Sequence, residues 1–170
     1  KGEIIWQHHK ANEQIISTNA AYLMDYALTQ VTQTGTAKSL AWRLKGYQLA
    51  GKTGTSNDLR DSWFIGYDNK LLITTWLGKD DNKPTGLTGS SGALLLFADF
   101  INKQGVTDKE RSTPNAVAMT LFERKTGHAV TSKCDNTEHY PAISAGIVIQ
   151  QTCLEEKAIG LSWLEKLFGD

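Results

Sequence analysis

The sequence predicts an α+β fold, in which helices pack on an antiparallel β-sheet. Three short segments rich in β-branched and aromatic residues follow one another closely, at residues 46–55, 62–67 and 71–77. Connections this short join antiparallel neighbours, because parallel strands need a long crossover. An amphipathic helical pattern precedes these strands and another follows them. We therefore expect helix to cover the sheet.

Composition narrows the class of protein. The chain has 170 residues, 40% of them hydrophobic, enough for a core and for one domain or slightly more. Eighteen basic and eighteen acidic residues give a net charge of zero, which disfavours nucleic acid as a partner. The chain opens at Lys1 without a leader or a membrane-spanning run, so we expect a segment of a longer protein.

The elements before the sheet are a strand and a helix. Residues 3–7 have the β-branched and aromatic content of a strand. Ser17 or Thr18 can cap a helix over residues 20–34, which Gly35 would end. This helix has one apolar face to bury.

The second helix follows the three strands. Ser90 or Ser91 can cap it, and Gly105 would end it. Its apolar residues form a wide face that should lie on the sheet: Ala93, Leu94, Leu95, Leu96, Phe97, Phe100 and Ile101.

From Val106 onward the pattern changes, so we divide the chain into a main domain, residues 1–105, and a C-terminal extension, residues 106–170. The extension begins with a polar linker that contains Pro114. We expect a hairpin of residues 116–122 and 128–131, then a cysteine loop. Residues 159–168 form a short amphipathic helical pattern, which we expect to dock onto the main body.

The tripeptide Lys-Thr-Gly occurs at residues 52–54 and again at 125–127. The second copy divides two short apolar runs, where a turn needs a glycine, so we assign it to turn structure. The first copy lies in a predicted strand beside two further strands, so it can line a cleft.

Residues 46–53 also match the pattern of a phosphate-binding P-loop. A P-loop needs a glycine-rich loop after a strand and a helix that begins at the lysine. Residues 47–50 instead resemble a strand, and a turn at 56–58 prevents a following helix. We keep nucleotide binding as an alternative that predicts binding of Mg-ATP to this segment.

Four motifs then occur in order along the chain. They are Lys52-Thr-Gly-Thr55, Asp61-Ser-Trp-Phe-Ile-Gly-Tyr67, a strand with Trp76, and Gly89-Ser-Ser-Gly-Ala93 opening a helix. The chain resembles the C-terminal part of the transpeptidase domain of class A, bifunctional penicillin-binding proteins of Gram-negative bacteria. The resemblance implies a partial serine β-lactamase/D,D-peptidase-like transpeptidase fold, without a cofactor for the transpeptidase part.

The resemblance also implies roles for the first motif. Lys52 would place a positive charge in the cleft and support proton transfer during acylation. The hydroxyls of Thr53 and Thr55 would hold the terminal carboxylate of the substrate, and the backbone N–H of Thr55 would form half of an oxyanion hole. Gly54 would leave the strand edge open to an extended peptide.

The sequence departs from this family in one large respect. No Ser-x-x-Lys occurs in the 170 residues, so the acylated serine would lie outside this chain. Ser17-Thr-Asn19 fits another family motif, but helix capping explains it. We expect Trp63 and Trp76 to lie in the core, and exposed apolar patches to mark missing contacts.

Two cysteines, Cys134 and Cys153, lie in the extension. A structural disulfide between them would close a loop of about 20 residues and stabilise it by roughly 3 kcal/mol. It would require an oxidising compartment. Two unpaired thiols remain the alternative.

The function that the resemblance implies belongs to a longer parent. That parent would be a peptidoglycan synthase whose D,D-transpeptidase crosslinks stem peptides, is acylated by β-lactams, and has an upstream glycosyltransferase. We expect it in the periplasm, anchored in the inner membrane, with lipoprotein activators and divisome or elongasome proteins as partners. The alternative is a non-catalytic scaffold or partner-binding module.

Overall fold

The computed structural model describes residues 2–3, 5–6, 13–109 and 111–150. It contains two compact units, residues 1–114 and 115–170. The described residues of the N-terminal segment 2–6 form no regular element, so the strand predicted at 3–7 is wrong for them.

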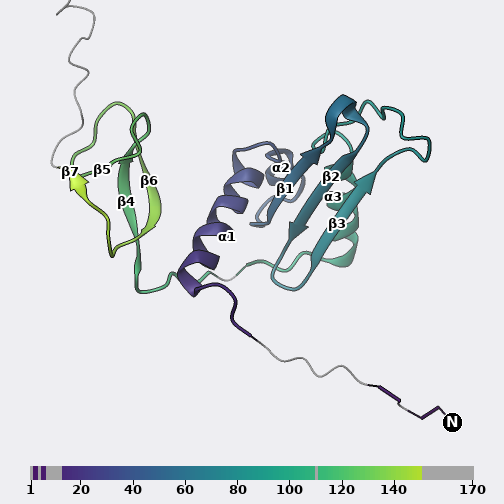
Figure 1. Cartoon of the computed structure of the whole chain (residues 1–170), viewed down its shortest axis with the longest axis horizontal. Helices are drawn as coiled ribbons and strands as arrows, with labels where there is room; N and C mark the ends of the chain where they lie inside the picture. The colour runs from purple at the N-terminus through teal and green to yellow at the C-terminus, as the bar shows by residue number, and fades with distance from the viewer. Residues whose placement is uncertain (1, 4, 7–12, 110, 151–170) are drawn as a thin grey trace, which may run out of the picture. The chain divides into compact units, whose positions relative to one another are not determined.

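The first unit is built on a three-stranded antiparallel sheet in the order β1-β2-β3, as the sequence predicts (Figure 1). The strands are β1 Ala50–Thr55, β2 Ser62–Tyr67 and β3 Leu72–Leu77. Helix α1 Thr18–Gln33 packs beside β1, and α3 Ala93–Gln104 lies behind β2 and β3. Two short helices, α2 Ser39–Arg43 and η1 Asn57–Leu59, complete the unit. Helix α2 was not predicted, because five residues give too short a pattern.

The core lies between α3 and one face of the sheet. The rings of Phe64 and Phe97 meet edge to face with centroids 4.8 Å apart. Gly51 and Gly66 pair across β1 and β2 on this face, and a Cβ at Gly66 would lie 2.5 Å from the Phe64 ring. The glycines therefore make room for the two rings. The buried cluster also includes Ala37, Leu40, Leu44, Leu49, Ala93, Leu94, Ala98 and Ile101.

The helix ends are capped in two different ways. Ser17 caps α1 by accepting a hydrogen bond from the N–H of Ala20 at 3.2 Å, as predicted. The cap predicted for α3 is wrong, because Gly92 is its N-cap and makes no side-chain cap bond. Instead, the buried hydroxyl of Ser62 on β2 accepts a hydrogen bond from the N–H of Ala93 at 2.8 Å.

The opposite face of the sheet exposes apolar side chains. Trp63 is 41% exposed and Trp76 is 47% exposed, so their predicted core positions are wrong. Their rings contact each other with centroids 5.9 Å apart, and Ile65 and Leu72 are also exposed. Cross-strand pairing places these residues on the face away from α3. This patch agrees with the exposed apolar surface expected from the sequence.

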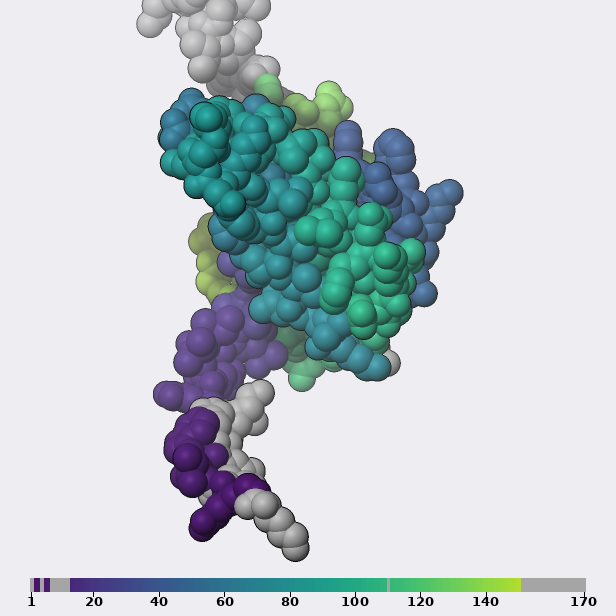
Figure 2. Space-filling model, turned by 90° about the vertical axis from the view of Figure 1, so that its right-hand side faces the viewer, coloured from purple at the N-terminus to yellow at the C-terminus, as the bar shows by residue number. Residues whose placement is uncertain are grey.

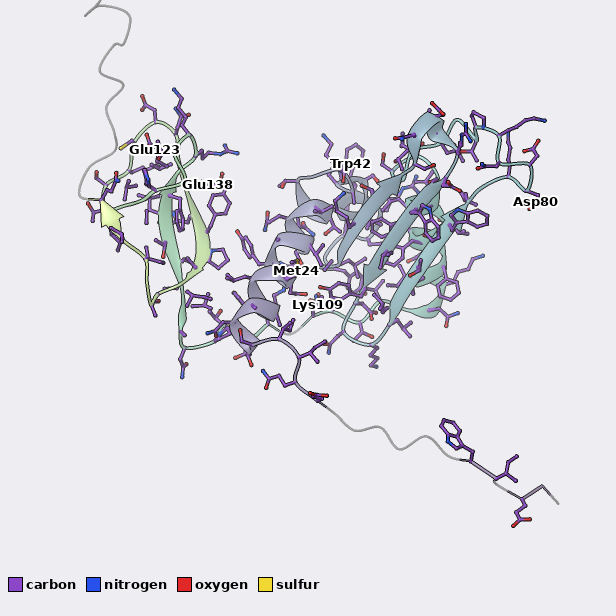
Figure 3. All side chains as sticks on the ribbon, viewed as in Figure 1. Met24, Trp42, Asp80, Lys109, Glu123 and Glu138 are labelled. Carbon is purple, nitrogen blue, oxygen red and sulfur yellow. The ribbon has the colours of Figure 1, made fainter. Side chains whose placement is uncertain are left out.

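The linker after α3 belongs to the first unit. The buried carboxylate of Asp68, in the β2–β3 turn, accepts hydrogen bonds from the N–H groups of Lys70, Leu71 and Thr107 at 2.7 to 2.9 Å. Lys109 lies against α1 and forms an ion pair with Asp25 (Figure 3). These bonds explain why the boundary between the units follows Pro114 and not Gly105.

The second unit contains a four-stranded sheet in the order β6-β4-β5-β7. The strands are β4 Val117–Glu123, β5 Ala129–Val130, β6 Thr137–Ile143 and β7 Ile149–Gln150. The predicted hairpin of β4 and β5 is present but pairs at one position, whereas β4 pairs with β6 along its whole length. Strand β6, within the expected cysteine loop, was not predicted.

The two halves of this second sheet resemble each other. Strands β6 and β7 begin 20 residues after β4 and β5, respectively. Strands β4 and β6 pair symmetrically about Thr120 and Tyr140. Cys134 is disulfide-bonded, whereas Cys153 and the amphipathic segment 159–168 lie outside the described residues. The pairing of these two cysteines therefore stays a prediction.

Candidate functional site: the edge strand β1

The first Lys-Thr-Gly copy lies on β1, which is an edge strand. In the described part of the chain β1 pairs with β2 alone. Lys52 and Thr55 are exposed, and Thr53 and Gly54 are half-buried. An edge strand leaves backbone groups unpaired by other strands, so it can receive an extended peptide.

Alternation along β1 sends its side chains to the two faces of the sheet. Lys52 and Gly54 share a face with Ile65 and Trp63, their cross-strand partners. The ammonium of Lys52 donates a hydrogen bond to the carbonyl of Thr53 at 2.9 Å. A Cβ at Gly54 would lie 3.1 Å from the Cβ of Trp63, so a side chain there would also disturb the neighbouring strand.

Each threonine hydroxyl of the motif has a partner from a different segment. The Thr53 hydroxyl lies 2.8 Å from that of Thr36, which follows α1, and either can be the donor. The Thr55 hydroxyl accepts a hydrogen bond from the N–H of Gly89 at 2.9 Å. Sequence reasoning missed both Thr36 and Gly89, because no local pattern announces a partner 17 or 34 residues away.

The turn after β1 holds its end in place. The hydroxyl of Ser56 bonds to Asp61 twice, to the carboxylate and to the N–H, each at 2.8 Å. The second carboxylate oxygen of Asp61 accepts the indole N–H of Trp76 at 3.0 Å. The motif Asp61-Ser-Trp-Phe-Ile-Gly-Tyr67 therefore links the end of β1 to β3.

Comparison with known proteins decides the family. Residues 2–85 match the penicillin binding protein transpeptidase domain. Penicillin-binding protein 1B of Vibrio cholerae is 34% identical over 168 residues, which cover 99% of this chain and 21% of the relative. Residues 2–85 belong to the penicillin-binding protein transpeptidase family.

Further relatives agree with this assignment. Penicillin-binding protein 1B of Haemophilus influenzae is 42% identical over 117 residues, 69% of this chain and 15% of the relative. The crystal structure of penicillin-binding protein 1A from the same species matches with a TM-score of 0.66 and 25% identity, over 82% of this chain and 22% of that one. The chain thus spans about a fifth of the length of these relatives or less.

For a member of this family, the P-loop match is accidental. Lys52 and Thr53 lie within β1, whereas a P-loop requires a helix to begin there. Residues 47–49 form no strand, so that part of the prediction is wrong, but β1 begins directly after them.

The second Lys-Thr-Gly copy forms a turn, as predicted. Gly127 has φ +73°, and the hydroxyl of Thr126 donates to Glu123 at 2.6 Å. Gly127 lines a hollow of about 360 Å³ together with Phe122, Glu123, Arg124, Tyr140 and Pro141. None of these residues belongs to the predicted transpeptidase site.

The sequence also did not predict a polar cluster beside α1. Asp25 accepts the Tyr67 hydroxyl at 3.0 Å and pairs with Arg111 at 2.7 Å and with Lys109. Burial of Tyr67, followed by the hydrogen bond to Asp25 and its negative charge, raises the pKa of Tyr67 to about 12. Because its members bond to one another, we assign the cluster to holding the linker.

The described residues offer neither a metal-binding cluster nor a membrane-spanning helix. They contain no group of three or more His, Cys, Asp or Glu side chains that could hold a metal ion. No helix among them has the length and apolar character needed to cross a membrane.

Proposed function

We propose that this chain is the C-terminal part of the D,D-transpeptidase of a peptidoglycan synthase. The observation that carries the proposal is the position of Lys52, Thr53, Gly54 and Thr55 on an edge strand, with Lys52 and Thr55 exposed. The free edge suits the extended stem peptide, and the exposed cation suits its terminal carboxylate.

In this proposal the residues of β1 bind the substrate and stabilise the oxyanion during an acyl transfer. A serine outside this chain attacks the peptide carbonyl, forms an acyl-enzyme and expels the terminal residue. The N–H of Thr55 supplies one donor to the oxyanion, while Lys52 and the two threonine hydroxyls hold the carboxylate. β-Lactams enter the same site and acylate the same serine.

The longer parent carries the remaining functions. It polymerises glycan strands with a glycosyltransferase upstream of this segment, and it needs no cofactor for crosslinking. It lies in the periplasm, anchored in the inner membrane, where lipoprotein activators and divisome or elongasome proteins bind it. The relatives named penicillin-binding protein 1B come from Gram-negative bacteria, which supports this location.

Labelling with a fluorescent penicillin tests the proposal. The label is applied to a longer chain that contains both this segment and a Ser-x-x-Lys motif. The chain is then denatured, so that only covalently bound label remains on it. We expect covalent labelling, strong loss of it in Lys52→Ala, and no loss in the control Lys103→Ala, which changes a lysine in the last turn of α3. An unlabelled longer chain would overturn the catalytic proposal in favour of the scaffold alternative.

A further inference from the structure

The segment between β3 and α3 lies against the backbone of the site strand. Figure 2 looks onto the side of the first unit formed by this segment and α3. Gly89 in the segment is buried, and its N–H donates to the Thr55 hydroxyl oxygen at 2.9 Å. A Cβ at Gly89 would lie 2.6 Å from the carbonyl oxygens of both Gly54 and Trp63. Only a residue without a side chain brings its N–H this close to Thr55.

Bonds on both sides hold Gly89 in this position. The buried Ser62 hydroxyl donates to the carbonyl of Thr88 at 2.7 Å and accepts the N–H of Ala93 at 2.8 Å. The carbonyl of Gly89 accepts the N–H of Leu94 at 3.0 Å. The N–H of Gly89 is therefore presented by a segment tied to β2 and to the first turn of α3.

This bond determines what the Thr55 hydroxyl can do. A hydroxyl has one proton to donate and two lone pairs. When the Gly89 N–H occupies one lone pair, the proton of Thr55 is directed elsewhere, and the hydroxyl becomes a stronger donor because linked hydrogen bonds polarise one another. The Thr53 hydroxyl has other partners: it pairs with that of Thr36 at 2.8 Å, where either can donate, and accepts a long hydrogen bond from the Lys52 ammonium at 3.5 Å.

We propose that Gly89 is a positioning residue, which orients the Thr55 hydroxyl as a hydrogen-bond donor toward an anionic group at β1. The inference rests on the proposed function for the identity of that group, the terminal carboxylate of a peptide. It adds that recognition of the carboxylate depends on a residue that does not touch the substrate.

Amide hydrogen exchange of the 170-residue chain tests the bond without any activity. We expect exchange at Gly89 to accelerate at least about tenfold in Thr55→Val and to stay unchanged in Thr55→Ser, which keeps the hydroxyl. The amides of Gly92 and Leu94, bonded to carbonyls of the same segment, report whether the segment stays folded. Unchanged exchange at Gly89 in Thr55→Val would overturn the inference.

Kinetics of the longer enzyme tests the consequence. For a peptide ending in a carboxylate, we expect Gly89→Ala to raise KM about tenfold or more, with a small effect on kcat. For the same peptide as a C-terminal amide, KM should change little. In a Thr55→Val background Gly89→Ala should add no further difference between the two peptides, because that difference acts through the hydroxyl.

Ser90→Ala is the matched control, because the Ser90 hydroxyl contacts Thr88 in the same segment. It should leave both peptides unaffected. Equal losses for both peptides in Gly89→Ala, or an undiminished difference between the peptides in the Thr55→Val background, would overturn the positioning role. An unmutated enzyme that forms no acyl-enzyme would instead overturn the proposed function, while the exchange result would still report on the bond.

Discussion

Asp68 shows how one side chain can fix a turn and a distant linker together. Burial alone would raise the pKa of its carboxyl, but the hydrogen bonds from Thr107, Leu71 and Lys70 outweigh burial and lower the pKa below its ordinary value. The charged form is therefore favoured in the folded chain. Its contribution to stability is complete above the unfolded pKa, about 4, and is lost as pH falls through the lower folded value.

Asp68→Asn should lower the free energy of unfolding of the first unit by about 2 kcal/mol at pH 7, because an amide N–H₂ would face a backbone N–H. The difference from the unmutated chain should shrink as pH falls through the folded pKa of Asp68, where the carboxylate itself is protonated. Urea unfolding followed by tryptophan fluorescence at several pH values measures both effects.

Asp81→Asn is the control for this experiment. Its pKa is also lowered, first by the hydrogen bond from Lys83, but its side chain is exposed. An exposed ion pair contributes little to stability, so this variant should unfold like the unmutated chain. Equal effects at both positions would contradict the account of Asp68.

At the level of elements, the start of α3 depends on a neighbouring strand. The hydroxyl of Ser62 on β2 bonds to groups on either side of the helix start, Thr88 and Ala93. Nearby Ser90 and Ser91 have the sequence position of a cap, but their hydroxyls bond to Thr88 in the preceding segment.

Ser62→Ala should therefore destabilise the first unit by about 1–3 kcal/mol, since it leaves the buried N–H of Ala93 without its partner. The Thr88 carbonyl keeps its bonds from the N–H groups of Ser91 and Gly92. Ser90→Ala should cost less than about 0.5 kcal/mol. Chemical denaturation of both variants checks the order. A larger loss of stability in Ser90→Ala than in Ser62→Ala would mean that Ser90, and not Ser62, caps α3.

The apolar side chains on the exposed face of the sheet should bind hydrophobic dyes and promote self-association. Trp76 and Trp63 form the centre of an apolar patch with Ile65 and Leu72. Trp76→Thr should weaken binding of the dye ANS to the isolated chain and reduce its self-association, measured by fluorescence and sedimentation. Trp42→Thr, a 71% exposed tryptophan on α2 (Figure 3), should change both much less.

At the scale of the whole molecule, the chain divides into two units that can respond separately. The first has a helix-covered sheet and a buried apolar cluster, and the second is a small sheet with two similar halves. Among its described residues the second unit buries few side chains, so its stability should depend on a crosslink more than that of the larger unit does.

Reduction with dithiothreitol should destabilise the second unit by roughly 3 kcal/mol if the predicted Cys134–Cys153 bond is its crosslink. Amide exchange at Phe122 and Ala129, which pair in the second sheet, should accelerate, while exchange at Phe64 and Phe97 should stay unchanged. Peptide mapping would identify the partner of Cys134. Acceleration in both units would show that they unfold together.

The sequence alone determined the local elements and the position of the site strand. Short connections required antiparallel β1, β2 and β3, and apolar periodicity located α1 and α3, because these signals arise within one element. The motif at residues 52–55 was likewise complete in the sequence, whereas the five residues of α2 and the two of β7 were too few to show a period. Pairing of β4 with β6 depends on residues 14 or more apart, which periodicity does not report.

Only the tertiary structure decided which groups meet. Trp63 and Trp76 are large aromatic residues of the kind that usually lie in a core. They lie on the uncovered face of the sheet, because α3 covers the opposite face. Similarly, capping by Ser62 and the bond from Gly89 to Thr55 join residues 31 and 34 apart. A hydrogen bond is specified by position and direction in space, and the chain acquires these only when α3 packs on the sheet.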